Sequence, residues 1–137
     1  MKKVVLFSLF IFSYFSFAQD KIDVKLKKDI VYLNGNECLK FSSPFMGNTT
    51  TFYSLEGEKL FYFDVRDAGK NSQGYIKIGF TDSDYTATVK NEITRRSLVK
   101  GLIEEGALEN CKINQDKIKN FVNRFDQNYE QSIIRVN

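Results

Sequence analysis

The chain has 137 residues, with 20 Lys and Arg against 17 Asp and Glu and a formal net charge of +3. This near balance gives no reason to expect a nucleic acid or an acidic membrane surface as a partner. Histidine is absent from the sequence, which excludes Ser–His and Cys–His nucleophiles, an imidazole general base and the commonest zinc ligand.

Residues 1–18 have the layout of a secretory signal peptide. Lys2 and Lys3 precede the uncharged run VVLFSLFIFSYFSF, and Ser16 and Ala18 stand at the −3 and −1 positions of a cut. The run is shorter than the roughly 20 apolar residues of a membrane-spanning helix, which makes an uncleaved anchor the less favoured reading. No Cys follows the cut, as a lipoprotein would require. We therefore expect cleavage, export to the periplasm or the medium, and no stable membrane anchor afterwards.

The mature chain would be a single domain of residues 19–137. Because Lys2 and Lys3 leave with the signal peptide, 18 basic and 17 acidic residues remain, a net charge of +1. A chain of this length can bury one hydrophobic core but not two.

The first part of the mature chain predicts β-strands. QDKIDVKLKK alternates apolar and charged residues, which is typical of an edge strand, although its charges could leave it frayed. IVYL and NECLKF flank Asn34-Gly35, a dipeptide that favours a type I′ hairpin turn. Gly57 marks a second turn, followed by the alternating run KLFYFDVR.

Two further strands follow a loop that is rich in turn residues, DAGKNSQG at 67–74. GYIKIGFT places alternate apolar residues on one face of a strand, and YTATV at 85–89 is a candidate for one more. Together these runs predict an antiparallel meander of five or six strands whose register the sequence leaves open.

From Asn91 the apolar spacing becomes helical. A first helix would place Ile93, Leu98, Val99, Leu102 and Ile103 on one side and end at Gly106. Gly101 inside it costs about 1 kcal/mol relative to Ala, so we expect a close approach to the sheet there.

A second helix is predicted from Asn114, a good N-cap. Its apolar stripe would contain Ile118, Phe121, Phe125 and Tyr129, together with Val122. Residues 132–136, SIIRV, fit either an extension of this helix or a short strand. The predicted fold is therefore α+β: an antiparallel five- to six-stranded β-meander followed by two C-terminal α-helices packed on the sheet.

This layout, with LVKGLIEEGAL and INQDKIKNFVNRF in the two helices, resembles that of small exported bacterial proteins with a signal peptide, a β-meander and two C-terminal helices. The resemblance covers most of the chain and rests on apolar spacing and turns. It implies no activity for any residue.

Cys38 and Cys111 are the two cysteines, and an even count in an exported chain suggests a disulfide. Closing this loop would contribute about 4–4.5 kcal/mol in the chain-entropy model. Strict alternation, however, places Cys38 on the strand face opposite Leu39, and across from Val31. A bond would then put the helices on the Cys38 face, whereas two separate buried thiols would put them over Leu39.

Three motifs are better explained by structure than by chemistry. Ser97 and Lys100 have the S-x-x-K spacing of Ser–Lys acyl enzymes, but the further motifs of those enzymes are missing. Asp82 and Asp84 are spaced as in a calcium loop, without its Gly and Glu. GKNS at 69–72 lacks the rest of a phosphate-binding loop. We expect no catalytic, cofactor or metal site.

The expected function is therefore binding without catalysis, with an unknown protein of the cell envelope or the medium as the partner, as for an inhibitor or an immunity-type protein. Four aromatic residues on loops or on the less apolar strand faces are candidates for the contact surface: Phe45, Tyr53, Tyr62 and Tyr75. The alternative is a carrier of a small apolar ligand between sheet and helices, and an enzyme is the least expected class. A binder should show an exposed apolar patch, a carrier an enclosed apolar cavity, and an enzyme a cleft with convergent ionisable groups.

Overall fold

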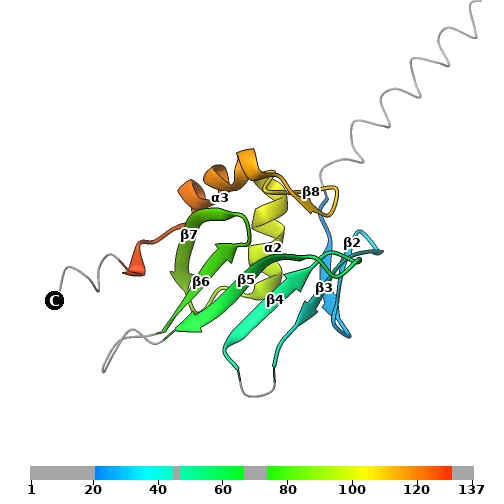
Figure 1. Ribbon diagram of the computed structural model, residues 1–137, viewed down its shortest axis with the longest axis horizontal. Coiled ribbons are helices and arrows are strands. Elements are labelled where there is room, and N and C mark those ends of the chain that lie inside the picture. The colour runs from blue at the N-terminus through cyan, green and yellow to red at the C-terminus, as the bar shows by residue number, and fades with distance from the viewer. Residues whose placement is uncertain (1–20, 45–46, 67–73, 131–137) are drawn as a thin grey trace, which may run out of the picture.

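The computed structural model describes residues 21–44, 47–66 and 74–130 of the chain. The expected signal peptide, Phe45, most of the 67–74 loop and the segment 132–136 lie outside the described residues. Within them the chain is α+β, with an antiparallel sheet followed by two α-helices (Figure 1).

The sheet has seven strands rather than five or six, and their order in the sheet is their order in the chain. The strands are β1 (Val24–Lys27), β2 (Ile30–Leu33), β3 (Asn36–Ser42), β4 (Thr49–Tyr53), β5 (Lys59–Arg66), β6 (Tyr75–Phe80) and β7 (Ser83–Lys90). The two segments that the sequence left uncertain, β1 and β7, are both strands and form the two edges of the sheet.

Alternation of side chains gives the sheet one apolar face, called here the inner face. Phe52, Phe61 and Phe63 are each 2% exposed or less, and the ring of Phe52 lies 4.5 Å from that of Phe61 and 4.8 Å from that of Phe63. Aromatic pairs at such distances add to the stabilisation that comes from area burial. Phenylalanine rings therefore make up much of the core.

The first two turns of the meander are both two-residue turns with positive φ. Asn34 and Gly35, with φ of 50° and 84°, join the paired residues Leu33 and Asn36, which confirms the predicted hairpin. Lys28 and Asp29, with φ of 51° and 65°, make the β1–β2 turn in the same way without a glycine. This turn was not predicted because Lys28-Asp29 lacks the glycine that usually marks a two-residue hairpin turn.

The helices begin and end near the expected residues. Helix α2 (Arg95–Glu104) is capped by Thr94, whose side chain accepts from the Ser97 amide, and Gly106 follows it with φ of 79°. A small hairpin, β8 (Leu108–Glu109) and β9 (Lys112–Ile113), joins the two helices and was not predicted.

The second helix is shorter than predicted. Asn114 is its N-cap as expected, but the first turn is the 3₁₀ segment η1 (Gln115–Lys117), and α3 (Ile118–Phe125) ends before Tyr129. Tyr129 is therefore not part of the helical stripe, although Ile118 and Phe121 are buried as predicted.

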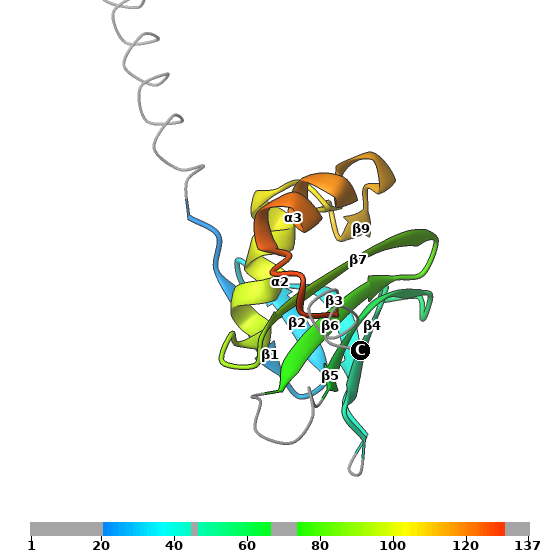
Figure 2. The same cartoon turned by 90° about the vertical axis from the view of Figure 1, so that its left-hand side faces the viewer.

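The two helices lie on the same side of the sheet and pack at its two edges (Figure 2). Helix α2 contacts β1, and α3 contacts β7. The expected close approach at Gly101 is real but involves the second helix: a Cβ there would collide with the ring of Phe125, not with the sheet. Gly101 thus allows α2 and α3 to approach each other.

Candidate functional site

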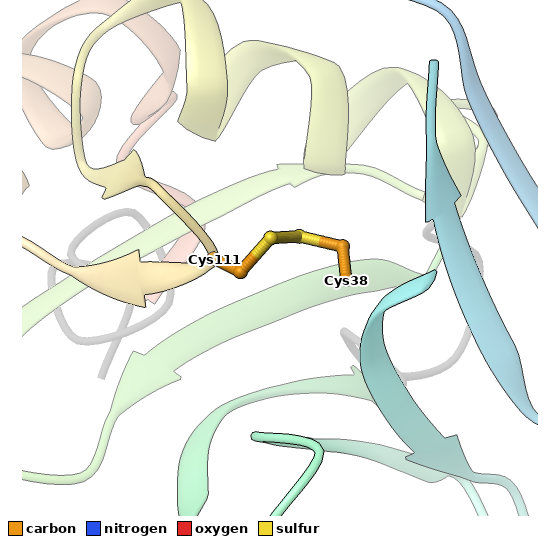
Figure 3. The surroundings of a disulfide bond; sticks show 2 residues. All are labelled: Cys38 and Cys111. Atoms are coloured by element: carbon orange, nitrogen blue, oxygen red, sulfur yellow. A yellow bond between two sulfur atoms is a disulfide. The ribbon is translucent and has the colours of Figure 1, made fainter. Parts of the chain in front are cut away.

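A disulfide joins Cys38 in β3 to Cys111 in the turn of the β8–β9 hairpin (Figure 3). The two Cα atoms are 5.3 Å apart, within the usual range for disulfides, and the two cysteines are 73 positions apart in sequence. The bond therefore connects the sheet to the link between the two helices, as the sequence predicted.

The parity argument against this bond was wrong because β2 and β3 are paired through a β-bulge. Val31 lies opposite Leu39 and Tyr32 opposite Glu37, which leaves Cys38 as the extra residue. A bulge places two successive residues against one partner, so that strict alternation is locally lost. Cys38 and Leu39 are consequently both buried, at 2% and 0% exposed, and the helices cover the Leu39 face while the bond is formed.

A hollow of about 410 Å³ lies beside the disulfide and opens to solvent. Its acidic lining residues are Glu56, Glu58 and Asp82, with Lys112 on the same rim. In the part of the chain that the structure describes, no group of three or more Cys, Asp or Glu side chains is arranged to hold a metal ion. We assign this hollow no ligand.

Charged residues on the outer face of the sheet, the face opposite the inner one, hold the segment that follows α3. Glu130 pairs with Lys77 at 3.2 Å and with Arg66 at 3.3 Å, and Arg66 also pairs with Asp64 at 2.9 Å. Burial alone would raise the pKa of Asp64, but hydrogen bonds from Arg66 and Thr49 and the nearby positive charges outweigh it, so that the pKa lies below its ordinary value. These charges satisfy one another within the fold.

Two of the three sequence motifs lie within the described residues, and GKNS at 69–72 lies outside them. Ser97 and Lys100 are exposed on α2 while Leu98 and Val99 between them are fully buried. Asp82 lies in the β6–β7 turn and Asp84 near the start of β7, both exposed.

The aromatic candidates are separated by the structure. Tyr53 and Tyr62 are partly buried on β4 and β5, and Lys59 lies over the Tyr62 ring at 5.8 Å. Tyr75 is only 4% exposed, because Tyr129 stacks on it with ring centroids 5.7 Å apart. Its ring belongs to the interior of the fold and offers little contact surface.

A different surface feature, which we call the basic groove, lies between β1 and the start of α2. It consists of two open hollows, of about 610 Å³ and about 540 Å³, which share Thr94 and Arg96. Leu26 and Phe41, both partly buried, form its apolar floor. Ile22 contributes a further apolar side chain at the second hollow.

Five cationic side chains line this groove: Lys25, Lys27, Arg95, Arg96 and Lys100. No carboxylate is among the described residues that line either hollow. The nearest recorded ion pair is Arg96 with Asp23 at 3.7 Å, between side chains that are 64% and 47% exposed, and a pair so exposed contributes little.

Local sequence explains how these charges are placed. Lys25 and Lys27 alternate with Leu26 along β1. Because the Leu26 side chain faces inward, the two lysine side chains are exposed beside the groove. Arg95 and Arg96 are the first two residues of α2, where the helix dipole disfavours cations. Arg95 is positioned by a hydrogen bond of 3.1 Å from its guanidinium to the Ser43 hydroxyl.

Sequence reasoning missed the basic groove. The available signal was the pair Arg95–Arg96 directly after a helix N-cap, because cations are unfavourable there and no acidic residue occupies the first turn. Its proximity to Lys25 and Lys27, some seventy positions earlier in the chain, could not be read without knowing that α2 packs on β1.

Comparisons with protein-family models, with curated proteins and with solved structures found no match to this chain. Among the described residues, no helix has the length and apolar character needed to cross a membrane.

Proposed function

We propose that the mature chain is a small exported protein without catalytic activity that acts by binding another protein at the basic groove. The observation that carries this proposal is the charge of the groove. Arg66 and Arg124 elsewhere on the surface pair with carboxylates of the fold. In the groove, five cations line two hollows that no described carboxylate lines, and Lys25, Lys27 and Lys100 make no ion pair with any described residue. Their charges are available to a partner.

Two observations support export to the periplasm or the medium as the setting. Disulfides such as Cys38–Cys111 form and persist in oxidising compartments and are rare in the cytosol. The first eighteen residues have the composition of a signal peptide. In that setting the partner would be an envelope or secreted protein, as for an inhibitor or an immunity-type protein.

The filling of the core favours surface binding over the carrier alternative. The space between sheet and helices holds Phe80 and Phe121, whose ring centroids are 6.2 Å apart, and Phe125 stacks on Phe121 at 4.7 Å. The hollows described above are open to solvent. A carrier would need an enclosed apolar cavity instead.

The test is affinity capture with immobilised protein that begins at Gln19, applied to envelope extract and culture medium. A groove variant, Lys25→Glu with Arg95→Glu, should lose the captured partner. A matched variant, Lys112→Glu with Lys119→Glu, changes the net charge equally at exposed positions outside the groove and should retain it. Capture that is equal for both variants would contradict the proposal.

A further inference from the structure

The basic groove is longer than a single small anion requires. Strand β1, Val24–Lys27, borders one side and spans about 10 Å at 3.3 Å per residue, and Ile22 lies before it. The side formed by α2, from Thr94 to Lys100, rises about 9 Å. One carboxylate or phosphate cannot reach cations spread over this length, so the geometry calls for a ligand with several negative charges along a chain.

The groove also combines its charge with an apolar floor. Leu26 and Phe41 are partly buried beneath the cationic rim, in an open hollow of about 610 Å³ that leaves room for an apolar side chain of a ligand. Phe41 is held in place by Phe52, with ring centroids 5.9 Å apart. Burial of an apolar side chain against these residues would supply affinity, while the rim charges would orient the ligand and speed its association.

Resting on the proposed function, we infer that the partner presents an acidic peptide segment with a large apolar side chain, which occupies the basic groove. The carboxylates of the segment pair with Lys25, Lys27 and the two arginines of α2. Its apolar side chain lies on Leu26 and Phe41.

An anionic membrane surface fits the groove less well. Interfacial binding uses apolar side chains that project from the protein beside its cations. Here the apolar side chains are recessed in the groove, and the only large hydrophobic residue exposed in the described part of the chain is Tyr85, in β7 at the opposite edge of the sheet.

The experiment measures the fluorescence anisotropy of a labelled synthetic peptide, EDFEDLED, titrated with the mature protein. Binding should weaken when sodium chloride is added, because exposed charges are screened. It should also weaken when Phe and Leu are replaced by Gly in EDGEDGED, or when the carboxylates are replaced by amides in QNFQNLQN. Amide signals of Leu26, Phe41 and Thr94 should shift on titration in NMR spectra.

The variants locate the site. Lys25→Glu with Arg95→Glu should lower the affinity for EDFEDLED about tenfold or more, because reversing rim charges replaces attraction by repulsion. Lys112→Glu with Lys119→Glu should change it by no more than about twofold. Circular dichroism of both variants should match the parent protein, which ensures that loss of binding is not loss of fold.

Several results would overturn the inference. They are absence of peptide binding, equal loss in both variants, and stronger binding through the same residues to phosphatidylcholine–phosphatidylglycerol vesicles or to an oligonucleotide. A fourth result is self-association of the protein alone in sedimentation experiments. It would indicate that the groove binds Glu56 and Glu58 of a second copy instead.

The two proposals can fail separately. If the captured partner depends on the groove but EDFEDLED does not displace it, this inference fails and the proposed function stands. If no captured protein depends on the groove, the proposed function fails whether or not the peptide binds.

Discussion

Single residues at two close contacts determine how the helices are placed. Gly101 leaves room for the Phe125 ring, and Cys111 has a φ of 61° in a two-residue turn where glycine is the usual residue. At both positions the residue is unfavourable for its local backbone conformation but permits a tertiary contact. Gly101 permits the approach of two helices, and Cys111 forms the disulfide.

Gly101→Ala should destabilise the protein although alanine favours helices. The added methyl group displaces the Phe125 ring, and overpacking of this kind costs about 1–3 kcal/mol. In a Phe125→Ala background the same substitution should be stabilising, by up to about 1 kcal/mol, because only the helix propensity remains. Urea denaturation of the four proteins measures this change of sign. Stabilisation by Gly101→Ala in both backgrounds would show that the contact is unimportant.

Replacing the cysteines should distinguish the contribution of the disulfide to stability from that of the turn at Cys111. Cys38→Ala and Cys111→Ala should each cost about 4–4.5 kcal/mol, the chain-entropy value for this loop. Cys111→Gly also removes the bond but relieves the positive φ, so it should be less destabilising than Cys111→Ala by about 1 kcal/mol. Thermal unfolding of the three variants without reductant tests the order. Equal effects of Ala and Gly at position 111 would contradict it.

At the scale of elements, the segment after α3 closes one edge of the sheet. The Thr88 amide donates to an Asp126 carboxylate oxygen at 2.9 Å, and the Gln127 amide donates to the Thr88 carbonyl at 2.8 Å. The Lys90 amide donates to the Gln127 side chain at 2.9 Å. Backbone groups of β7 that would otherwise face solvent are thereby paired, and this protects the edge from other chains.

Asp126→Ala should therefore destabilise the protein by about 1–3 kcal/mol, the cost of leaving buried donors unpaired. Hydrogen exchange at the amides of Thr88 and Lys90 should accelerate. Asp126→Asn keeps an acceptor oxygen and should have a smaller effect, and the exposed Asp84→Ala should change stability by no more than about 0.5 kcal/mol. Unchanged exchange at Thr88 in Asp126→Ala would show that the segment does not cover the edge.

The elements that the sequence predicted well are those with a strong local signal. Alternation in KLFYFDVR and the Asn34-Gly35 turn depend on neighbouring residues only. The bulge at Cys38 depends on how two strands pair, and the positive φ of Lys28 and Asp29 occurs in a turn without the glycine that marks such hairpins. The basic groove was missed for the same reason, since its cations come from segments far apart in the chain.

For the whole molecule, the two edges of the sheet differ. At β7 the segment from Asp126 to Tyr129 pairs with the strand, so this edge offers no template for another strand. At β1 the inward Val24 is 1% exposed and α2 contacts the strand, while Lys25 and Lys27 are exposed. Charged side chains on an edge strand disfavour pairing with another strand, which agrees with a site that binds its partner through cations and an apolar floor.

Acid should weaken the whole fold in part through Asp64. Because its pKa is lower in the folded protein than its ordinary value, its contribution is complete above the ordinary pKa and is lost as the pH falls through the folded one. At neutral pH, Asp64→Asn should cost up to about 1 kcal/mol, as expected for a partly exposed pair. The difference from the parent protein should shrink below about pH 4. Denaturation midpoints measured from neutral to acid pH check this, and a difference that does not depend on pH would contradict it.

The order of the strands has a consequence for how the chain folds. Each strand of the meander pairs with the one before it, so most of the sheet assembles from contacts that are local in sequence, which favours rapid folding. The exceptions are α2 on β1 and the bond from Cys38 to Cys111, both of which close loops of some seventy residues. With two cysteines in the sequence, only one intramolecular pairing exists. An oxidant is then sufficient to complete the bond, and no disulfide isomerase is required.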